Sequence, residues 1–275
     1  MAPSADAKRT RREQDASDAI KVSTKDHIGT ITFNRPESRN AFTLEMLEEC
    51  SGVLADFRDD PEIRVIVLTG AGESFCSGGD VKKMGRATTV SQRKSDLWKR
   101  MQSVPKMLAT VDKPVIAMIN GDAVGGGMDI ALMCDIRVAS HKARFSQAYV
   151  RLGLVPGDGG AFFLARLIGL GRALELLLTG DFVDAQKAEQ LGMVNYCVRH
   201  EELEEKTYGI ARKIAALPPL AVQTTKRLTY QSFQNEMIAA LELASSQAAI
   251  MSTSDDHKEA VGAFREKRRA IYKGA

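Results

Sequence analysis

The fold of this chain is decided by two glycine-rich stretches, Phe75-Cys76-Ser77-Gly78-Gly79-Asp80 and Asn120-Gly121-Asp122-Ala123-Val124-Gly125-Gly126-Gly127-Met128-Asp129. Each follows an apolar run typical of a buried strand, at residues 65–68 and 115–119. Each is also expected to open a helix, where unpaired backbone N–H groups point at whatever lies at the turn. Two such helix starts that face each other make a two-donor oxyanion hole, which stabilises negative charge on a carbonyl oxygen.

Length and composition describe an ordinary globular chain. Its 275 residues allow one or two domains, and a net charge of +3 does not require a nucleic-acid partner. No run approaches the roughly 18 apolar residues of a membrane span, so no membrane partner is expected. The four cysteines form no CxxC pair and the four histidines no HExxH cluster, so no metal site is expected. Scattered cysteines are typical of free thiols in the cytoplasm.

Residues 1–18 are polar and are predicted to form a disordered arm. The arm lacks the apolar core of a signal peptide, which argues against secretion. It also carries a basic cluster typical of targeting signals, so import into an organelle stays open as the alternative to a cytoplasmic location. The cluster consists of Lys8, Arg9, Arg11 and Arg12.

Beyond the arm, predicted strands and helices alternate, and the last part of the chain is helical. We expect strands at residues 20–25, 28–33, 65–68, 115–119, 136–139 and 193–198, and helices at 43–59, 91–108, 128–134, 159–168 and 172–179. Thr43 is the expected N-cap of the first helix, and Pro105 is expected to interrupt the second. After Pro218-Pro219 the pattern predicts helices at 221–233, 237–251 and 256–270. The fold class is therefore α/β, with a core over residues 19–217 and a helical oligomerisation region over 218–275.

Residues 125–127 alone indicate only a loop, and they fit neither a P-loop nor a GxGxxG fingerprint. The combination of motifs is far more specific. Phe75-x-Ser77-Gly78-Gly79-Asp80 followed by Asn120-Gly121-x4-Gly126-Gly127 resembles the crotonase family, the enoyl-CoA hydratase/isomerase superfamily. Further segments agree in order: Asn34-Arg35-Pro36-x3-Asn40-Ala41, Leu132-x-Cys134-Asp135-Ile136-Arg137-Val138-Ala139, Gly153-Leu154-x-Pro156-x2-Gly159-Gly160 and Asp184-Ala185-x2-Ala188-x2-Leu191-Gly192.

This resemblance implies a crotonase-like spiral of ββα units with a C-terminal helical trimerisation region, and trimers that usually pair into hexamers. It also implies a coenzyme A thioester as substrate and no metal or redox cofactor, since coenzyme A is part of the substrate. By position, the backbone N–H groups of Gly79 and Gly126 would form the oxyanion hole. Glycine suits both positions because a Cβ would crowd the thioester.

Asp129 is the main acid–base candidate. It lies three residues after Gly126, about one helical turn along, so its carboxylate can stand near the same reacting centre. Members of the family commonly have an acid here, usually glutamate, whereas aspartate is one methylene shorter. The alternative role for Asp129 is stabilisation of the helix start.

Two further residues mark a departure from the family pattern. Tyr149 stands where typical hydratases have a second glutamate, and a phenol with an ordinary pKa of about 10 is a poor base at neutral pH. Tyr149 is therefore either a proton donor or relay, or an apolar wall of the pocket. Asp158 is the natural replacement acid, but an aspartate before two glycines is also an ordinary turn residue.

Five residues are candidates for binding coenzyme A. Ser77 fits a binding loop better than a nucleophile, since no histidine is adjacent, and Asp80 fits the N-cap of a short helix over residues 81–84. Lys82 and Lys267 are candidate anchors for phosphates, with a solvated surface lysine as the alternative for each. Phe264 and Lys267 match family positions that approach the nucleotide end.

The sequence thus predicts an acyl-CoA enzyme, most directly an enoyl-CoA hydratase. Hydration needs a base for water and an acid for the α-carbon. Because a single carboxylate such as Asp129 can shuttle a proton between carbons, a double-bond isomerase is the close alternative. A hydrolase or lyase of a cyclic or aromatic acyl-CoA, with Tyr149 and Asp158 as specialised groups, is another. A relative that binds RNA is the non-enzyme alternative, against which the near-neutral charge argues.

Overall fold

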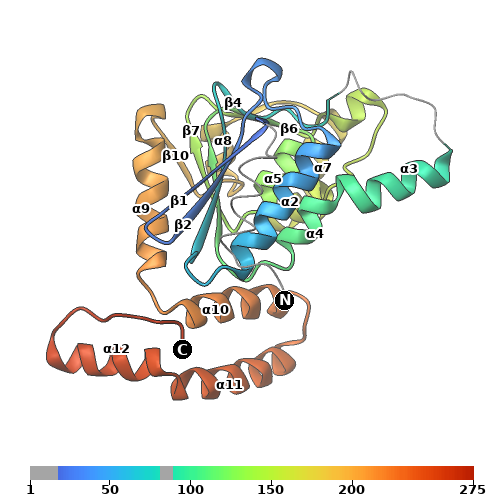
Figure 1. Ribbon diagram of the computed structural model, residues 1–275. Helices are drawn as coiled ribbons and strands as arrows, with labels where there is room; N and C mark the ends of the chain where they lie inside the picture. The colour runs from blue at the N-terminus through green and yellow to red at the C-terminus, as the bar shows by residue number, and fades with distance from the viewer. Residues whose placement is uncertain (1–17, 81–88) are drawn as a thin grey trace, which may run out of the picture.

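Two β-sheets and the helices around them form the main body of the molecule (Figure 1). The computed structural model describes residues 18–80 and 89–275. The predicted arm, apart from Asp18, and the predicted helix over residues 81–84 lie outside the described residues. What is described is the predicted core and the helical region that follows it.

The larger sheet has six strands in the order β1-β2-β3-β5-β7-β10, and the smaller has four in the order β4-β6-β8-β9. Only β1 in the larger sheet and β9 in the smaller run antiparallel to their neighbours. The strands are Ile20–Lys25 (β1), Ile28–Phe33 (β2), Val65–Gly70 (β3), Ser74–Cys76 (β4), Val115–Ile119 (β5), Asp122–Val124 (β6), Ile136–Ser140 (β7), Arg144–Ser146 (β8), Val183–Asp184 (β9) and Tyr196–Val198 (β10).

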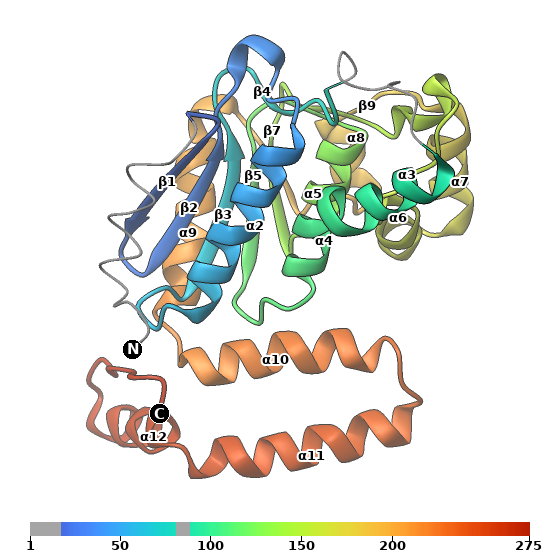
Figure 2. The same ribbon diagram turned by 45° about the vertical axis from the view of Figure 1, so that its right-hand side comes forward.

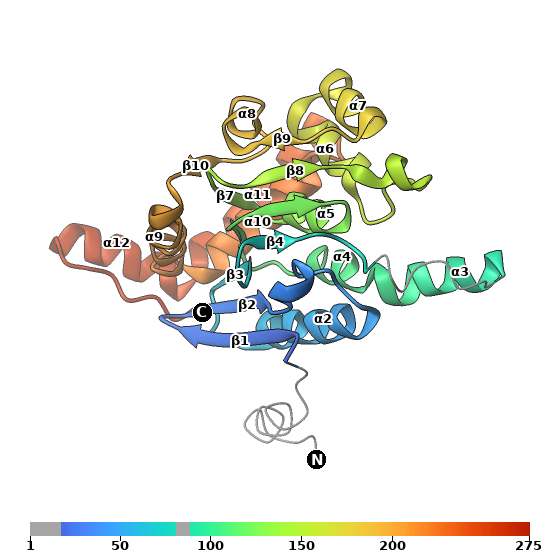
Figure 3. The ribbon, with the colours of Figure 1, turned by 90° about the horizontal axis from the view of Figure 1, so that it is seen from above.

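From β3 to β8, consecutive strands alternate between the two sheets, and helices follow each pair (Figure 3). The pairs are β3 with β4, β5 with β6, and β7 with β8, which makes the predicted α/β spiral of ββα units. The helices of this part are Leu44–Asp59 (α2), Val90–Asp96 (α3), Leu97–Met101 (η3, a π-helix), Ser103–Leu108 (α4), Gly126–Met133 (α5), Gly160–Ile168 (α6), Leu170–Thr179 (α7), Ala185–Gln190 (α8) and Leu203–Ala215 (α9), with 3-10 turns at Pro36–Ser38 (η1), Ala148–Leu152 (η4) and His200–Glu202 (η5).

The inner strands β2, β3 and β5 of the larger sheet are buried on both faces, and the side chains of each strand alternate between these faces. In β3, Ile66 and Leu68 join the main core, which includes the inner face of α2. Val65 and Val67 point the other way and pack in a second core under α9. An uninterrupted apolar strand is what a sheet covered on both sides requires.

Local capping explains where the early helices begin. Thr43 caps α2 as predicted, because its side-chain oxygen accepts a hydrogen bond from the Met46 N–H at 3.3 Å. The helix predicted over residues 91–108 is divided into three segments, α3, η3 and α4. The break before α4 lies at Gln102 rather than at Pro105. Pro105 lies in the first turn of α4, where a missing N–H costs no intrahelical hydrogen bond.

The last three helices form a separate layer beneath the main body (Figure 2). They are Pro219–Ser232 (α10), Met237–Thr253 (α11) and Asp255–Glu266 (α12). The sequence predicts the last helix as far as residue 270, but it ends earlier because Lys267 takes a left-handed conformation with φ 53°. The tail then returns to Asp256, whose carboxylate accepts hydrogen bonds from the N–H groups of Lys273 and Gly274 at 2.8 and 2.9 Å.

The connection between β5 and β6 depends on a glycine. A methyl group at Gly121 would lie 1.8 Å from the carbonyl oxygen of Glu73, in the segment that leads into β4. The backbone would have to move, so Gly121→Ala is expected to lower the free energy of unfolding by at least about 2 kcal/mol in urea titration. Gly209→Ala is the control, because nothing lies within 4 Å of its added methyl. That change in the middle of α9 is expected to stabilise by about 0.5–1 kcal/mol.

Candidate active site

Two buried asparagines fix the segment that leads into the first glycine turn. The side-chain amides of Asn40 and Asn120 both donate to the carbonyl oxygen of Ser74, at 2.7 and 3.1 Å. Asn40 also donates to Ala71, and it has φ 55°, a conformation that asparagine tolerates better than most residues. The start of β4, and with it the position of Gly79, is therefore set from two directions.

The two glycine turns lie in direct contact. A Cβ on Gly78 would lie 2.8 Å from the carbonyl oxygen of Val124 and 3.3 Å from the backbone nitrogen of Gly126. A Cβ on Gly127 would lie 2.1 Å from the carbonyl oxygen of Cys76. Side chains at these positions would push the turns apart, so the glycines are what allows the two backbones to meet.

The N–H groups of Gly79 and Gly126 donate to no acceptor among residues 18–80 and 89–275. Phe42 pairs with Gly79 in a parallel bridge, where the Phe42 N–H donates to Gly78 and the Asp80 N–H donates to Phe42. The N–H of Gly79 itself therefore points to the opposite side. Gly126 is the first residue of α5, so its N–H has no acceptor within the helix. This geometry suits the predicted oxyanion hole.

Beside these turns lies a buried cluster of two carboxyl groups and a phenol. The Tyr149 hydroxyl donates to Asp129 Oδ2 at 2.8 Å and lies 3.4 Å from Asp158 Oδ2. The side-chain amide of Gln147 donates to Asp129 Oδ1 at 2.6 Å. Asp129 is fully buried, Asp158 is 7% exposed and Tyr149 is partly exposed. The structure thus brings together all three residues that the sequence nominates as catalytic.

Burial shifts the titration of all three groups. Loss of hydration raises the pKa of Asp129 to about 6, although hydrogen bonds from Gln147, Tyr149 and backbone N–H groups oppose the shift. Burial, followed by the charge of Asp129, raises the pKa of Asp158 to about 7. The same two causes raise the pKa of Tyr149 far above its ordinary value. Two carboxyl groups that titrate near neutrality are suited to giving and taking protons.

The other predicted residues lie in different places. Ser77 borders the turn, with its hydroxyl 3.4 Å from the carbonyl oxygen of Ser38, and Asp80 lies 3.6 Å from the Arg35 guanidinium. Lys82 lies outside the described residues. Phe264 belongs to α12 and Lys267 follows it, in the lower layer away from the glycine turns of the same chain (Figure 2). Their roles in binding coenzyme A stay predictions.

Three residues of the site escaped the sequence analysis. Gln147 lies two residues before Tyr149, but only the fold shows that it holds Asp129. A Cβ on Gly126 would lie 2.6 Å from the Phe42 ring, so Phe42 supports the second turn. A Cβ on Gly160 would lie 2.1 Å from Asp129 Oδ1, so glycine is needed there for the carboxylate to fit. In the sequence, only the glycine pair at 159 and 160 indicated that the backbone comes close to another group there.

The described part of the chain contains neither a cluster of metal ligands nor a membrane-spanning helix. Within residues 18–80 and 89–275, no three His, Cys, Asp or Glu side chains are placed to hold a metal ion together. None of the helices in those ranges is long and apolar enough to cross a bilayer. The expectation that the protein needs no metal or redox cofactor stays a prediction.

The fold and the paired glycine turns agree with what comparisons find. Residues 23–275 match the family model described as enoyl-CoA hydratase/isomerase. The chain belongs to this family. The resemblance drawn from its motifs and the predicted crotonase fold are thereby confirmed.

Individual relatives share this family assignment along nearly their whole length. A short-chain-enoyl-CoA hydratase of Clostridium acetobutylicum is 38% identical, over 88% of this chain and 92% of that protein. A crotonyl-CoA hydratase of Syntrophomonas wolfei is 34% identical, over 94% and 98%. The crystal structure of an enoyl-CoA hydratase from Bacillus anthracis superposes with a TM-score of 0.89 at 36% identity, over 94% of this chain and all of that one.

The raised pKa of Asp158 predicts that this residue destabilises the folded protein at high pH. Folding raises its pKa from 3.8 to about 7, so the folded state binds the proton more tightly and stability falls as pH rises through that window. Asp158→Asn removes the loss. The variant is expected to exceed the wild type by about 1–3 kcal/mol at about pH 8 and by much less at about pH 5, by urea titration.

Asp26→Asn is the matched control for this prediction. Asp26 is exposed in the turn between β1 and β2 with φ 52°, which asparagine adopts readily. Its effect on stability should be the same at both pH values. A difference between Asp158→Asn and wild type that does not grow with pH would contradict the prediction.

Proposed function

We propose that this protein hydrates an enoyl-CoA thioester through an enolate held in an oxyanion hole. The observation that carries the proposal is the contact between two glycine turns beside a buried pair of carboxyl groups. The N–H groups of Gly79 and Gly126 would receive the thioester oxygen, where negative charge develops when water attacks the β-carbon. Asp129, Tyr149 and Asp158 would supply the base for water and the acid for the α-carbon.

Hydration is favoured over isomerisation by the position of Asp158. From the sequence, only Asp129 had a firm place at the reacting centre, and one carboxylate suffices to move a proton between carbons. The structure adds a second carboxyl group, with Asp158 Oδ2 3.2 Å from where a Cβ on Gly126 would lie. Two acid–base groups next to the same turn match the two proton transfers that hydration needs.

The choice of substrate is tested by a panel of thioesters. Purified protein is assayed with crotonyl-CoA, a 3-enoyl-CoA and an aromatic acyl-CoA. Consumption of crotonyl-CoA with formation of a 3-hydroxy product is expected. Conversion of the 3-enoyl-CoA alone would instead favour the isomerase, and cleavage of the aromatic thioester alone would favour the hydrolase or lyase.

The oxyanion role is tested at Gly126. Gly126→Pro removes the N–H donor, and proline is compatible with the first position of a helix. We expect turnover to fall about 10²–10³-fold, as for other oxyanion donors. Gly126→Ala is the matched control, since it also places a Cβ 2.6 Å from the Phe42 ring but keeps the N–H. Equal activity of the folded proline and alanine variants would remove this donor from the mechanism.

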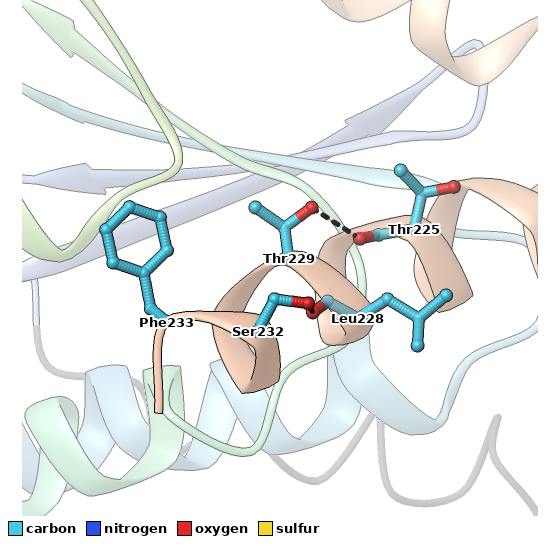
Figure 4. A pocket seen from close by; sticks show the side chains of 5 residues that line it. All are labelled: Thr225, Leu228, Thr229, Ser232 and Phe233. Carbon is cyan, nitrogen blue, oxygen red and sulfur yellow. Dashed lines mark hydrogen bonds between the residues drawn. The ribbon is translucent and has the colours of Figure 1, made fainter. Parts of the chain in front are cut away.

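We also propose that the protein assembles into trimers or hexamers through its C-terminal layer. α10 carries a shallow surface pocket lined by Thr225, Leu228, Thr229, Ser232 and Phe233 (Figure 4). At the end of α10 and on α11, large apolar side chains are strongly exposed in one chain, an arrangement typical of an interface. These are Phe233, Met237, Ile238 and Leu241.

Assembly is tested by light scattering. The wild type is expected to have the mass of a trimer or hexamer, and a variant with Ile238→Glu and Leu241→Glu is expected to dissociate, because charges would be buried without partners. Val90→Glu, which changes an exposed apolar residue of α3, serves as the control and should leave the mass unchanged. A wild-type monomer at micromolar concentration would refute the assembly.

A cytoplasmic location is part of the same proposal. All four cysteines are free thiols, three of them buried, which suits a reducing compartment. Import guided by the basic arm is the alternative. Cell fractionation with and without residues 1–18 distinguishes the two.

A further inference from the structure

Asp129 is surrounded by donors on both of its oxygens. Gln147 donates to Oδ1 and Tyr149 to Oδ2, and the backbone N–H groups of Gly160 and Asp158 also act to lower the pKa of the carboxyl group. The side chain is fully buried, and Gly160 presses so closely on Oδ1 that no Cβ would fit. A carboxyl group bonded only to donors is stabilised as the carboxylate. It also has no free face for a substrate.

Asp158 has the opposite surroundings. Its Oδ1 is buried and has no hydrogen-bond partner among the described residues, and its Oδ2 meets only the Tyr149 hydroxyl, at 3.4 Å. A phenol has one hydrogen, and Tyr149 already gives it to Asp129 at 2.8 Å. A hydrogen bond between Tyr149 and Asp158 therefore requires that Asp158 carries a proton and donates it to the phenol oxygen. Two charged carboxylates would repel each other across the shared hydroxyl.

Contacts of the second glycine turn show which acid–base groups lie beside the proposed oxyanion site. A Cβ on Gly126 would lie 3.2 Å from Asp158 Oδ2, and a Cβ on Gly125 would lie 3.8 Å from Cζ of Tyr149. The phenol head and the Asp158 carboxyl group therefore border the proposed oxyanion site. Asp129 is fully buried and accepts a hydrogen bond from the Tyr149 hydroxyl.

We propose that Asp158, Tyr149 and Asp129 form a proton relay, in which Asp158 holds the proton at rest and Asp129 acts on the substrate only through Tyr149. The relay rests on the proposed hydration. In this relay, Tyr149 contacts the attacking water, at the place of a family glutamate. Asp129 positions Tyr149 and accepts its proton. Gln147 is a second positioning residue, because it fixes the Asp129 carboxylate.

The steps balance within this set of groups. The water oxygen bonds to the β-carbon while the π electrons move through the α-carbon onto the thioester oxygen. The water proton passes to the Tyr149 oxygen as the phenolic proton passes to Asp129. The enolate electrons then form a C–H bond at the α-carbon with the proton of Asp158, which becomes a carboxylate. Asp129 finally returns a proton to the phenol, whose own proton moves to Asp158, and the resting state is restored.

The proton assignment is tested by infrared spectroscopy of the whole protein, without substrate. The spectrum is followed from about pH 5 to about pH 8, because burial raises the pKa of both carboxyl groups into this range. A carboxylic acid C=O band is expected in the wild type and in Asp26→Asn, and its loss is expected in Asp158→Asn. A band that survives Asp158→Asn and disappears in Asp129→Asn would overturn the assignment.

The relay itself is tested by a double-mutant cycle on hydration. Tyr149→Phe and Asp129→Asn are each expected to lower kcat about 10²-fold or more with KM unchanged, because each blocks the same transfer. The double variant should then be no slower than either single one. Tyr149→Phe with nearly full kcat beside an inactive Asp129→Asn would show that Asp129 acts directly, and losses that multiply would show two separate roles.

Gln147 provides an independent check. Gln147→Leu is expected to lower kcat about 10-fold with KM unchanged, and Gln190→Leu, at an exposed position of α8, is the control. A change in KM alone would make Gln147 a purely structural residue. If the wild type hydrates no enoyl-CoA, the proposed function fails, whereas the infrared spectra still decide the proton assignment.

Discussion

Close contact between two glycine turns is the constraint on which the rest of the structure depends. Backbone atoms of the segment after β4 and of the start of α5 approach so closely that a Cβ on Gly78 or Gly127 would overlap a carbonyl oxygen of the other turn. Only glycine permits such a close approach of two backbones, and the surrounding elements hold the two turns in place. Asn40 and Asn120 hold the first turn at Ser74, while the parallel strands β4 and β6 place the second beside it.

The same contact determines what can be buried next to it. Once α5 begins at Gly126, Asp129 projects one turn later into a space closed by Gly160, Gln147 and Tyr149. Asp158 arrives from the loop before α6. Burying two carboxyl groups costs stability, and the cost appears as raised pKa values. Carboxyl groups whose burial lowers the stability of the fold, and which lie beside backbone N–H donors, are typical of an active site.

Much of the fold was predictable because its signals are local. Apolar runs such as residues 65–68 mark strands buried on both faces, and Thr43 begins α2 by a cap that the sequence shows directly. The errors arise where distant contacts decide. The last helix ends at Glu266, where Lys267 takes a left-handed conformation and the tail then returns to bond to Asp256. The break before α4 lies at Gln102, whose side chain bonds to the distant carbonyl of Gly157.

The sequence by itself determined the family, the two glycine turns and the identity of the acid–base candidates, since each depends on residue types at fixed spacing. It left Tyr149 and Asp158 undecided between chemistry and ordinary structural roles. Only the tertiary structure placed both against Asp129 and showed that Gln147 holds that carboxylate. The reason is physical: which carboxyl group is charged depends on burial and on the count of hydrogen-bond donors around it, and segments far apart in the chain supply those donors.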